Sequence, residues 1–142
     1  MTENQIAKIV VDVAYNLHVT FGPGLLESVY ETLMCYELER RGLRVSRQQI
    51  LPLIYNEIVI EEAFRADIIV EDKVIIEIKS VEQLAKVHYK QVLTYLKVAD
   101  KKLGLLINFG DRLIKDGIKR IANGLEDEDC KVPMDLPSLL KS

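Results

Sequence analysis

The segment from residue 64 to residue 80, "FRADIIVEDKVIIEIKS", constrains the fold more than any other part of the chain. It contains two apolar runs separated by a short polar turn, which is typical of a β-hairpin. Its register can be predicted, because a slip of one residue would move every side chain to the opposite face of the sheet. The register that separates apolar from charged residues places the following residues opposite each other: Ala66 and Ile78, Ile68 and Ile76, and Val70 and Val74. One face of the predicted hairpin is then entirely apolar.

The other face of this hairpin pairs Asp67 with Glu77 and Arg65 with Lys79. Opposed side chains on adjacent strands have Cβ atoms about 5 Å apart, so the two carboxylates should repel each other, and partial burial strengthens the repulsion. A shared proton, a neighbouring cation or a bound metal ion has to compensate. Two carboxylates beside a lysine suit Mg²⁺ or Mn²⁺. The alternative is a structural cluster of salt bridges, Asp67 with Arg65 and Glu77 with Lys79.

The rest of the chain predicts helices before and after this hairpin. Apolar residues at helical spacing indicate a helix over residues 4–19 and a second one that ends at Gly42, with Leu26, Val29, Tyr30, Leu33 and Glu37 or Leu38 on its buried side. Short strands with a turn at Asn56 and Glu57 follow. A helix over 84–99 and a buried strand over 103–109 come after the hairpin, and residues 112–123 are ambiguous between helix and strand. This order predicts an α/β or α+β fold with helices over a mixed sheet. We expect a single domain over 1–125 and a loosely ordered acidic tail over 126–142.

Composition excludes several classes of protein. No apolar run is long enough to span a bilayer, and the first residues lack the pattern of a secretory signal, so we expect no membrane association. Two distant cysteines give no metal or disulfide framework, which favours the cytoplasm. The two histidines are far apart in the sequence and indicate no zinc site. The formal net charge of −3 argues only weakly against binding to nucleic acid.

Two predicted helix faces carry further polar candidates. Glu27 and Tyr30 share a face, as do His88, Gln91 and Tyr95. A glutamine on an apolar face needs hydrogen-bond partners, which an active face could supply. The alternatives are a solvated glutamine, a Glu27 that only complements the helix dipole, and a Tyr30 that belongs to the core with its hydroxyl bonded.

Basic residues form two groups, which are Arg40, Arg41, Arg44 and Arg47, and then Lys115, Lys119 and Arg120. Such groups are most often solvated, but beside the acidic face they would form a track for phosphates.

The residues "RAD", nine further residues and "EIK", followed by a helix with Gln91 and Tyr95, resemble the PD-(D/E)XK nuclease superfamily. The upstream segment "GPGLLESVYE" is similar to the signature of the GxxExxY proteins, a branch of that superfamily, with Gly24, Glu27 and Tyr30 at the named positions. Ala66 stands where the superfamily motif has proline, a position that ligates nothing.

The resemblance implies a nuclease-like core with a central mixed sheet flanked by helices. It implies that Asp67 and Glu77 ligate a divalent metal together with the Ile78 carbonyl, and that Glu27 is an additional ligand. Lys79 would orient or activate the attacking water.

By the same resemblance Gln91 would contact the lysine, the water or a phosphate, with Tyr30, Tyr95, Arg65 and His88 in supporting positions. The expected function is metal-dependent hydrolysis of nucleic acid with Mg²⁺ or Mn²⁺ as cofactor, with DNA favoured over RNA. Enzymes of this fold that cut both strands of a duplex often form dimers, so a homodimer is a further expectation. The alternative is a non-catalytic module that keeps the fold to bind nucleic acid or protein.

Overall fold

The computed structural model describes residues 1–125, so the expected tail at 126–142 lies outside the described residues. The elements are α1 (Glu3–Phe21), α2 (Glu27–Arg40), β1 (Val45–Tyr55), β2 (Ile58–Val70), β3 (Val74–Lys79), α3 (Lys86–Ala99), β4 (Leu103–Asn108), α4 (Ile114–Gly117) and β5 (Ile118–Ala122). The ambiguous segment 112–123 therefore contains both a short helix and a strand.

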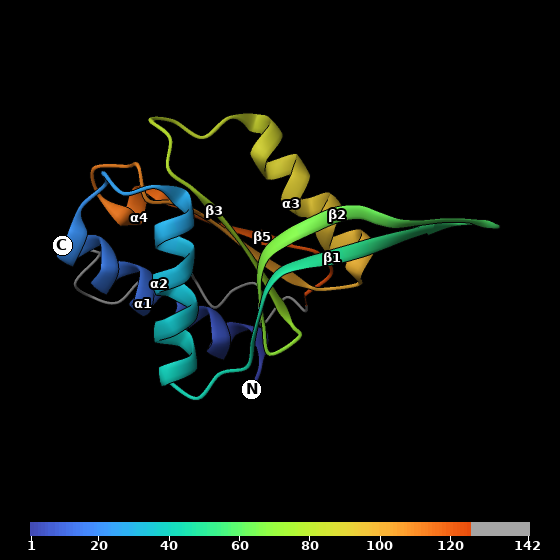
Figure 1. Ribbon diagram of the computed structural model, residues 1–142, viewed down its shortest axis with the longest axis horizontal. Coiled ribbons are helices and arrows are strands. Elements are labelled where there is room, and N and C mark those ends of the chain that lie inside the picture. Colours follow the sequence, from blue (N-terminus) through green and yellow to red (C-terminus); the bar gives the residue numbers. More distant parts are fainter. Residues whose placement is uncertain (126–142) are drawn as a thin grey trace.

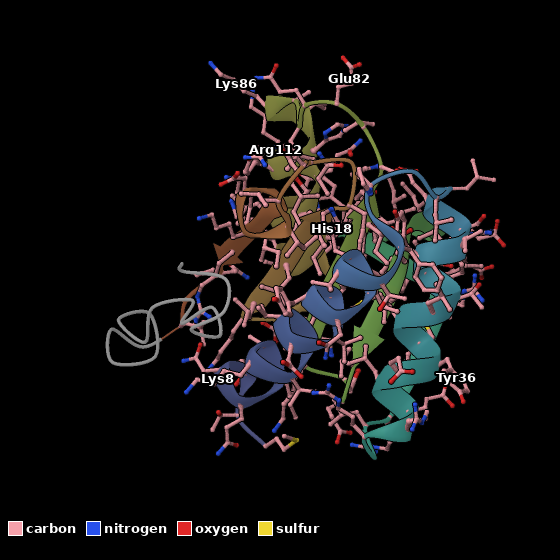
Figure 2. All side chains as sticks on the ribbon, turned by 90° about the vertical axis from the view of Figure 1, so that its left-hand side faces the viewer. Lys8, His18, Tyr36, Glu82, Lys86 and Arg112 are labelled. Carbon is pink, nitrogen blue, oxygen red and sulfur yellow. The ribbon has the colours of Figure 1, made fainter. Side chains whose placement is uncertain are left out.

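The strands form one mixed sheet in the order β1-β2-β3-β4-β5, in which β3 and β4 are parallel and the other neighbours are antiparallel. Helices α1 and α2 cover one face, and α3, which connects β3 to β4, covers the other (Figure 1). Figure 2 shows α1 and α2 side by side across their face of the sheet. The predicted mixed α+β fold is confirmed. Because β3 and β4 are parallel, their carboxyl ends meet at one edge of the molecule.

Local sequence accounts for the two N-terminal helices. The Thr2 hydroxyl accepts a hydrogen bond from the Gln5 amide at 3.1 Å, while the Gln5 side chain accepts one from the Thr2 amide at 2.8 Å, so α1 begins with a capping box. The buried side of α2 consists of Tyr30, Glu31, Met34, Cys35 and Leu38. The prediction that Leu26 and Val29 belong to this side was wrong, since α2 begins only at Glu27 and both side chains are exposed.

The predicted register of the hairpin is confirmed where β2 and β3 pair, with Ile68 opposite Ile76 and Val70 opposite Val74. The expected pair of Ala66 with Ile78 does not form. Ala66 packs instead with the apolar cluster under α3, because the regular alternation of β2 is interrupted between Ala66 and Ile68. Gln48, which lies at the same level on the neighbouring strand β1, has a φ of 53°, so the backbone of β1 is irregular there as well.

The hairpin of β1 and β2 is longer than the sequence predicts. Its turn at Asn56 and Glu57 is where we expected it, but β2 runs without a break into the predicted hairpin. The far part of the two strands extends well beyond the other elements (Figure 1). Among residues 1–125, no helix is both long and apolar enough to cross a membrane.

Candidate active site

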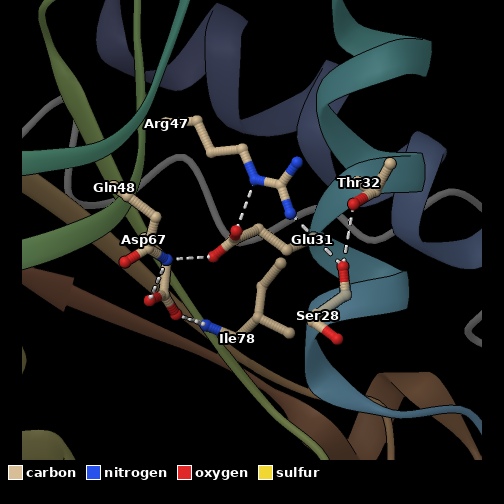
Figure 3. Close-up of polar contacts among 7 residues, drawn as sticks. All are labelled: Ser28, Glu31, Thr32, Arg47, Gln48, Asp67 and Ile78. Atoms are coloured by element: carbon tan, nitrogen blue, oxygen red, sulfur yellow. Dashed lines mark hydrogen bonds and ion pairs between the residues drawn. The ribbon is translucent and has the colours of Figure 1, made fainter.

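Asp67 lies where β2 and β3 separate. The strands pair from Ile68 to Val70, and beyond that point the ladder ends. The Asp67 Oδ2 atom then accepts a hydrogen bond from the backbone N–H of Ile78 at 2.8 Å, in the place of a partner carbonyl (Figure 3). The carboxylate therefore fills the opening between the two strands, and the backbone of Ile78 is held directly beside it.

Glu77 is the second carboxyl group of the site, and its side chain is buried at the end of β3. Its Oε1 atom has no hydrogen-bond partner within residues 1–125. Burial first, and then hydrogen bonding with Asp67 and the Asp67 charge, together raise the pKa of Glu77 to about 10, while the Lys79 charge acts in the opposite direction. A buried carboxyl with an unpaired oxygen beside a second carboxylate is a place where a cation would be stabilised.

Lys79 ends β3 on the same side of the strand as Glu77 and is half-buried. Its backbone carbonyl accepts a hydrogen bond from the Phe109 amide at 2.9 Å, and it lies opposite Asn108 in the parallel pair with β4. The Lys79 charge acts on the buried Glu77 carboxyl group, which places the ammonium group near that carboxyl. Asp67, Glu77 and Lys79 are thus brought together.

Helix α3 places only part of its predicted face at this site. Tyr95 is half-buried against Phe64, with the ring centroids 5.0 Å apart, and burial followed by the charges of Glu77 and Asp67 raises its pKa. Gln91 is exposed and borders, with Tyr95 and Phe64, a shallow cavity of about 270 Å³. His88 accepts a hydrogen bond from the Ala85 amide through Nδ1 at 3.0 Å, so it stabilises the start of the helix.

The comparison with protein families agrees with this geometry. A family model described as the PD-(D/E)XK nuclease superfamily matches residues 4–121. The chain belongs to this superfamily. No curated protein and no solved structure matches the chain significantly. The mixed five-stranded sheet flanked by helices is consistent with the fold of this superfamily.

Within residues 1–125, three residues that the sequence associated with the superfamily site form no hydrogen bond or ion pair with its carboxylates. Glu27 is exposed at the first position of α2. Tyr30 is buried, its hydroxyl donates to the Gly22 carbonyl and accepts from the Leu25 amide, and its ring stacks on Phe109, as expected for a core residue. Arg65 is exposed, and its expected partnership with Lys79 does not form because the ladder ends before it.

The sequence did not predict the polar network that links Asp67 to α2 through hydrogen bonds. The Gln48 amide donates to Asp67 Oδ1 at 3.3 Å and to Glu31 Oε1 at 2.6 Å, and Arg47 Nε donates to Glu31 Oε2 at 2.5 Å (Figure 3). Glu31 is buried, and α2 thus reaches the site through Glu31 and Gln48. A carboxylate beside the apolar positions Tyr30 and Met34 was the available signal for Glu31.

The arginines between Arg40 and Arg47 do not form an open phosphate track. Each one pairs with a carboxylate, in the pairs Arg40–Glu37, Arg41–Asp12, Arg44–Glu71 and Arg47–Glu31. Their charge is therefore largely balanced within the protein. Arg120, in the second basic group, lies in β5 and has partners of its own.

The donor set fits a magnesium-like ion. Within residues 1–125, no three histidine, cysteine or carboxylate side chains come together as a metal-binding group. Mg²⁺ is commonly held by one or two carboxylates and completes its shell with water and substrate phosphate, so the pair of Asp67 and Glu77 is sufficient. The unpaired Glu77 Oε1 supplies the oxygen that such an ion requires. Members of the superfamily generally use divalent metals.

Proposed function

We propose that the protein is a metal-dependent nuclease that hydrolyses phosphodiester bonds, with Mg²⁺ or Mn²⁺ as cofactor and DNA favoured over RNA as substrate. Asp67 and Glu77 would hold the metal. The observation that carries the proposal is the unpaired, buried Glu77 Oε1 beside the Asp67 carboxylate, at the opening between β2 and β3. The hydrogen bond from Ile78 accounts for Asp67 in the sheet, but no partner within residues 1–125 accounts for the buried Glu77 Oε1.

Each residue of the site has a definite part in this proposal. When bound, the metal supplies Lewis-acid chemistry that polarises the phosphate and lowers the pKa of a bound water. The Ile78 carbonyl is proposed as a further ligand, since the Ile78 backbone lies against Asp67. Lys79 would stabilise the negative charge that develops on the phosphate or orient the water. Gln91, at the rim of the cavity beside Tyr95, would contact a substrate phosphate.

The finer assignment to the GxxExxY branch is also a proposal. It is supported by the part that Tyr30 plays in the turn between α1 and α2, because its hydroxyl bonds two backbone groups there. That turn is linked to the end of β3, which carries Glu77 and Lys79, since the Ser80 Oγ atom donates a hydrogen bond to the Leu25 carbonyl at 2.9 Å. Glu27 begins α2 next to this contact, so we keep it as an additional ligand to be tested. A cytoplasmic location stays a prediction.

A cleavage panel tests the function. Single- and double-stranded DNA and RNA are incubated with the protein and Mg²⁺, Mn²⁺ or chelator. We expect cleavage that chelator abolishes and that Asp67→Asn, Glu77→Gln and Lys79→Ala each reduce by about a hundredfold or more. Glu39→Gln, which removes an exposed carboxylate near the other end of α2, is the matched control and should cleave like the wild type. Metal-dependent cleavage that persists in all three site variants would exclude this assignment.

A non-catalytic binding module is the second candidate, because the arginines that could bind phosphates are already paired with carboxylates. Calorimetric titration with Mg²⁺ separates the two. The nuclease requires Mg²⁺ binding that is lost in Asp67→Asn. A module without metal requires no such binding, and its affinity for nucleic acid would not depend on Asp67 or Glu77.

A further inference from the structure

The projecting end of the β1–β2 hairpin, which we call the arm and define as residues 53–60, has an unusually apolar surface. In the arm, Tyr55 opposes Ile58 and Leu53 opposes Ile60, so these four side chains share one face, while Ile54 and Val59 share the other. The exposed fractions are 68% for Ile54 and Tyr55, 60% for Ile58, 57% for Val59 and 47% for Ile60. A two-stranded ribbon without a covering layer is only marginally stable in water, and a contiguous apolar surface of this kind marks an interaction site.

The arm is suited to binding through its faces more than through its edges. Pro52 lies on the outer strand of the sheet and has no N–H to donate, and the pairing register shifts between Leu51 and Leu53. Proline and irregular pairing on an edge strand oppose the addition of a further strand. The side chains of the arm therefore have to make the contact.

The charges around the arm indicate what kind of partner it accepts. Between Gln48 and Arg65 the sequence contains Glu57, Glu61 and Glu62 and neither lysine nor arginine. An acidic and apolar ribbon repels the phosphates of nucleic acid. It would also repel the segment "EDED" at residues 126–129 of its own chain.

A complementary surface lies at the base of the same arm. A groove of about 530 Å³ runs between β1 and the end of α3, lined on one side by Leu51, Pro52 and Ile54 and on the other by Lys97 and Val98. Lys97 is exposed, and none of the ion pairs found in residues 1–125 involves it. Asp72 and Lys101 also line the groove and pair with each other, so the groove offers apolar contacts and the positive charge of Lys97 to an acidic, apolar ribbon.

We propose that the arm and this groove form a twofold interface between two copies of the chain. Because the arm and the groove are contiguous, two copies placed antiparallel can each insert the arm end into the groove of the other, which is the self-complementary contact that a twofold dimer needs. Glu57 at the tip of one arm then approaches the Lys97 region of the second copy. The inference is independent of the proposed nuclease activity, since no site residue takes part.

The available area indicates a dimer of modest strength. The arm side chains of two copies can bury roughly 700 Å² of apolar surface, if each hides only about 60 Å² because it is already partly covered in the free protein. Because a little more than half of a typical interface is apolar, the total is about 1,200 Å², near the lower limit for specific complexes. We therefore expect a dissociation constant in the micromolar range and a dimer that depends on concentration.

Sedimentation velocity of the full chain, at about 1 to 500 µM, tests the proposal. The wild type should shift from monomer to dimer across this range. The double variant Tyr55→Lys/Ile58→Lys should raise the dissociation constant by about tenfold or more, and so should Lys97→Glu, which removes the positive charge without altering the arm. Val19→Lys, at another strongly exposed apolar side chain, is the matched control and should dimerise like the wild type.

The outcomes are distinct. A wild type that stays monomeric at every concentration overturns the proposal and leaves the arm to another occupant. A dimer that neither the arm variant nor Lys97→Glu weakens overturns it as well, because the two copies then meet elsewhere. If the arm variant loses its native circular dichroism, Lys97→Glu alone decides, since Lys97 lies on α3 outside the arm.

Discussion

Replacing Glu77 by glutamine should make the metal-free protein more stable at alkaline pH. Glutamine keeps the shape of the side chain, and its amide can donate to Asp67 as a protonated carboxyl does, but it cannot ionise. In the wild type, burial and Asp67 raise the folded-state pKa of Glu77 to about 10, from an ordinary value of 4.5. Folding at neutral pH therefore requires that this carboxyl take up a proton or that its charge be buried.

The sign and size of the effect follow from proton linkage. A group whose pKa is raised by folding stabilises the fold below its unfolded-state pKa, and this contribution is lost as the pH rises toward the folded-state pKa. Each pH unit costs about 1.4 kcal/mol, so the wild type should lose up to about 4 kcal/mol of unfolding free energy between pH 5 and pH 8 through Glu77 alone. Glu77→Gln has no such loss. The observed difference between the two proteins should be about 2–4 kcal/mol, since local relaxation reduces the ceiling.

Urea unfolding at several pH values in chelator provides the measurement. The wild-type and Glu77→Gln curves should diverge as the pH rises, whereas Glu39→Gln, which removes an exposed carboxylate, should follow the wild type. Mg²⁺ at about a hundred times its dissociation constant should raise the unfolding free energy of the wild type at pH 8 by about 2.7 kcal/mol, because the metal ion takes the place of the proton on Glu77. The same concentration should not stabilise Glu77→Gln. Parallel pH profiles for the wild type and Glu77→Gln would refute the burial of Glu77 beside Asp67.

Three further predictions concern the rest of the molecule. Asn108→Ala should lower the free energy of unfolding, measured in urea, by about 2–4 kcal/mol. The fully buried side-chain amide of Asn108 bonds Val81, Gly110 and Asp111, and its loss would leave backbone groups of Val81 unpaired. A loss below 1 kcal/mol, about the value of one ordinary hydrogen bond, would show that water replaces the amide as the partner of these groups. Tyr30→Phe keeps the stacking on Phe109 but leaves the Leu25 amide without its acceptor, so thermal unfolding should show a loss of about 1–3 kcal/mol, and an unchanged melting temperature would contradict the role of the hydroxyl. Burial raises the pKa of the Cys35 thiol to about 11, so the contribution of the thiol to stability is present below pH 9 and is lost as the pH rises above it. By pH 10.5 the wild type should lose about 2 kcal/mol of unfolding free energy relative to Cys35→Ala. A difference in unfolding free energy that stays constant from pH 8 upward would show that folding does not change the pKa of the thiol.

Period and spacing within residues 64–80 were enough to predict the central hairpin and the charges it carries. Alternation of apolar and charged residues predicted the pairing of Ile68 with Ile76 and placed Glu77 and Lys79 on one side of β3, because a slip of one residue would have mixed apolar and charged side chains on both faces. The motif built on these residues also indicated the superfamily that the family comparison shows. These features depend on period and spacing within one short segment, which a sequence displays directly.

The way in which the rest of the chain packs around this hairpin could not be predicted from local patterns. β2 separates from β3 at Asp67, at the level where Gln48 on β1 has a positive φ, and no local sequence pattern indicates either feature. Glu31 is the acid of α2 that is linked to Asp67, through Gln48, whereas Glu27 is exposed. Helical spacing tells which residues share a face, but not which end of that face lies over the carboxylates, because that is set by packing between segments distant in the sequence.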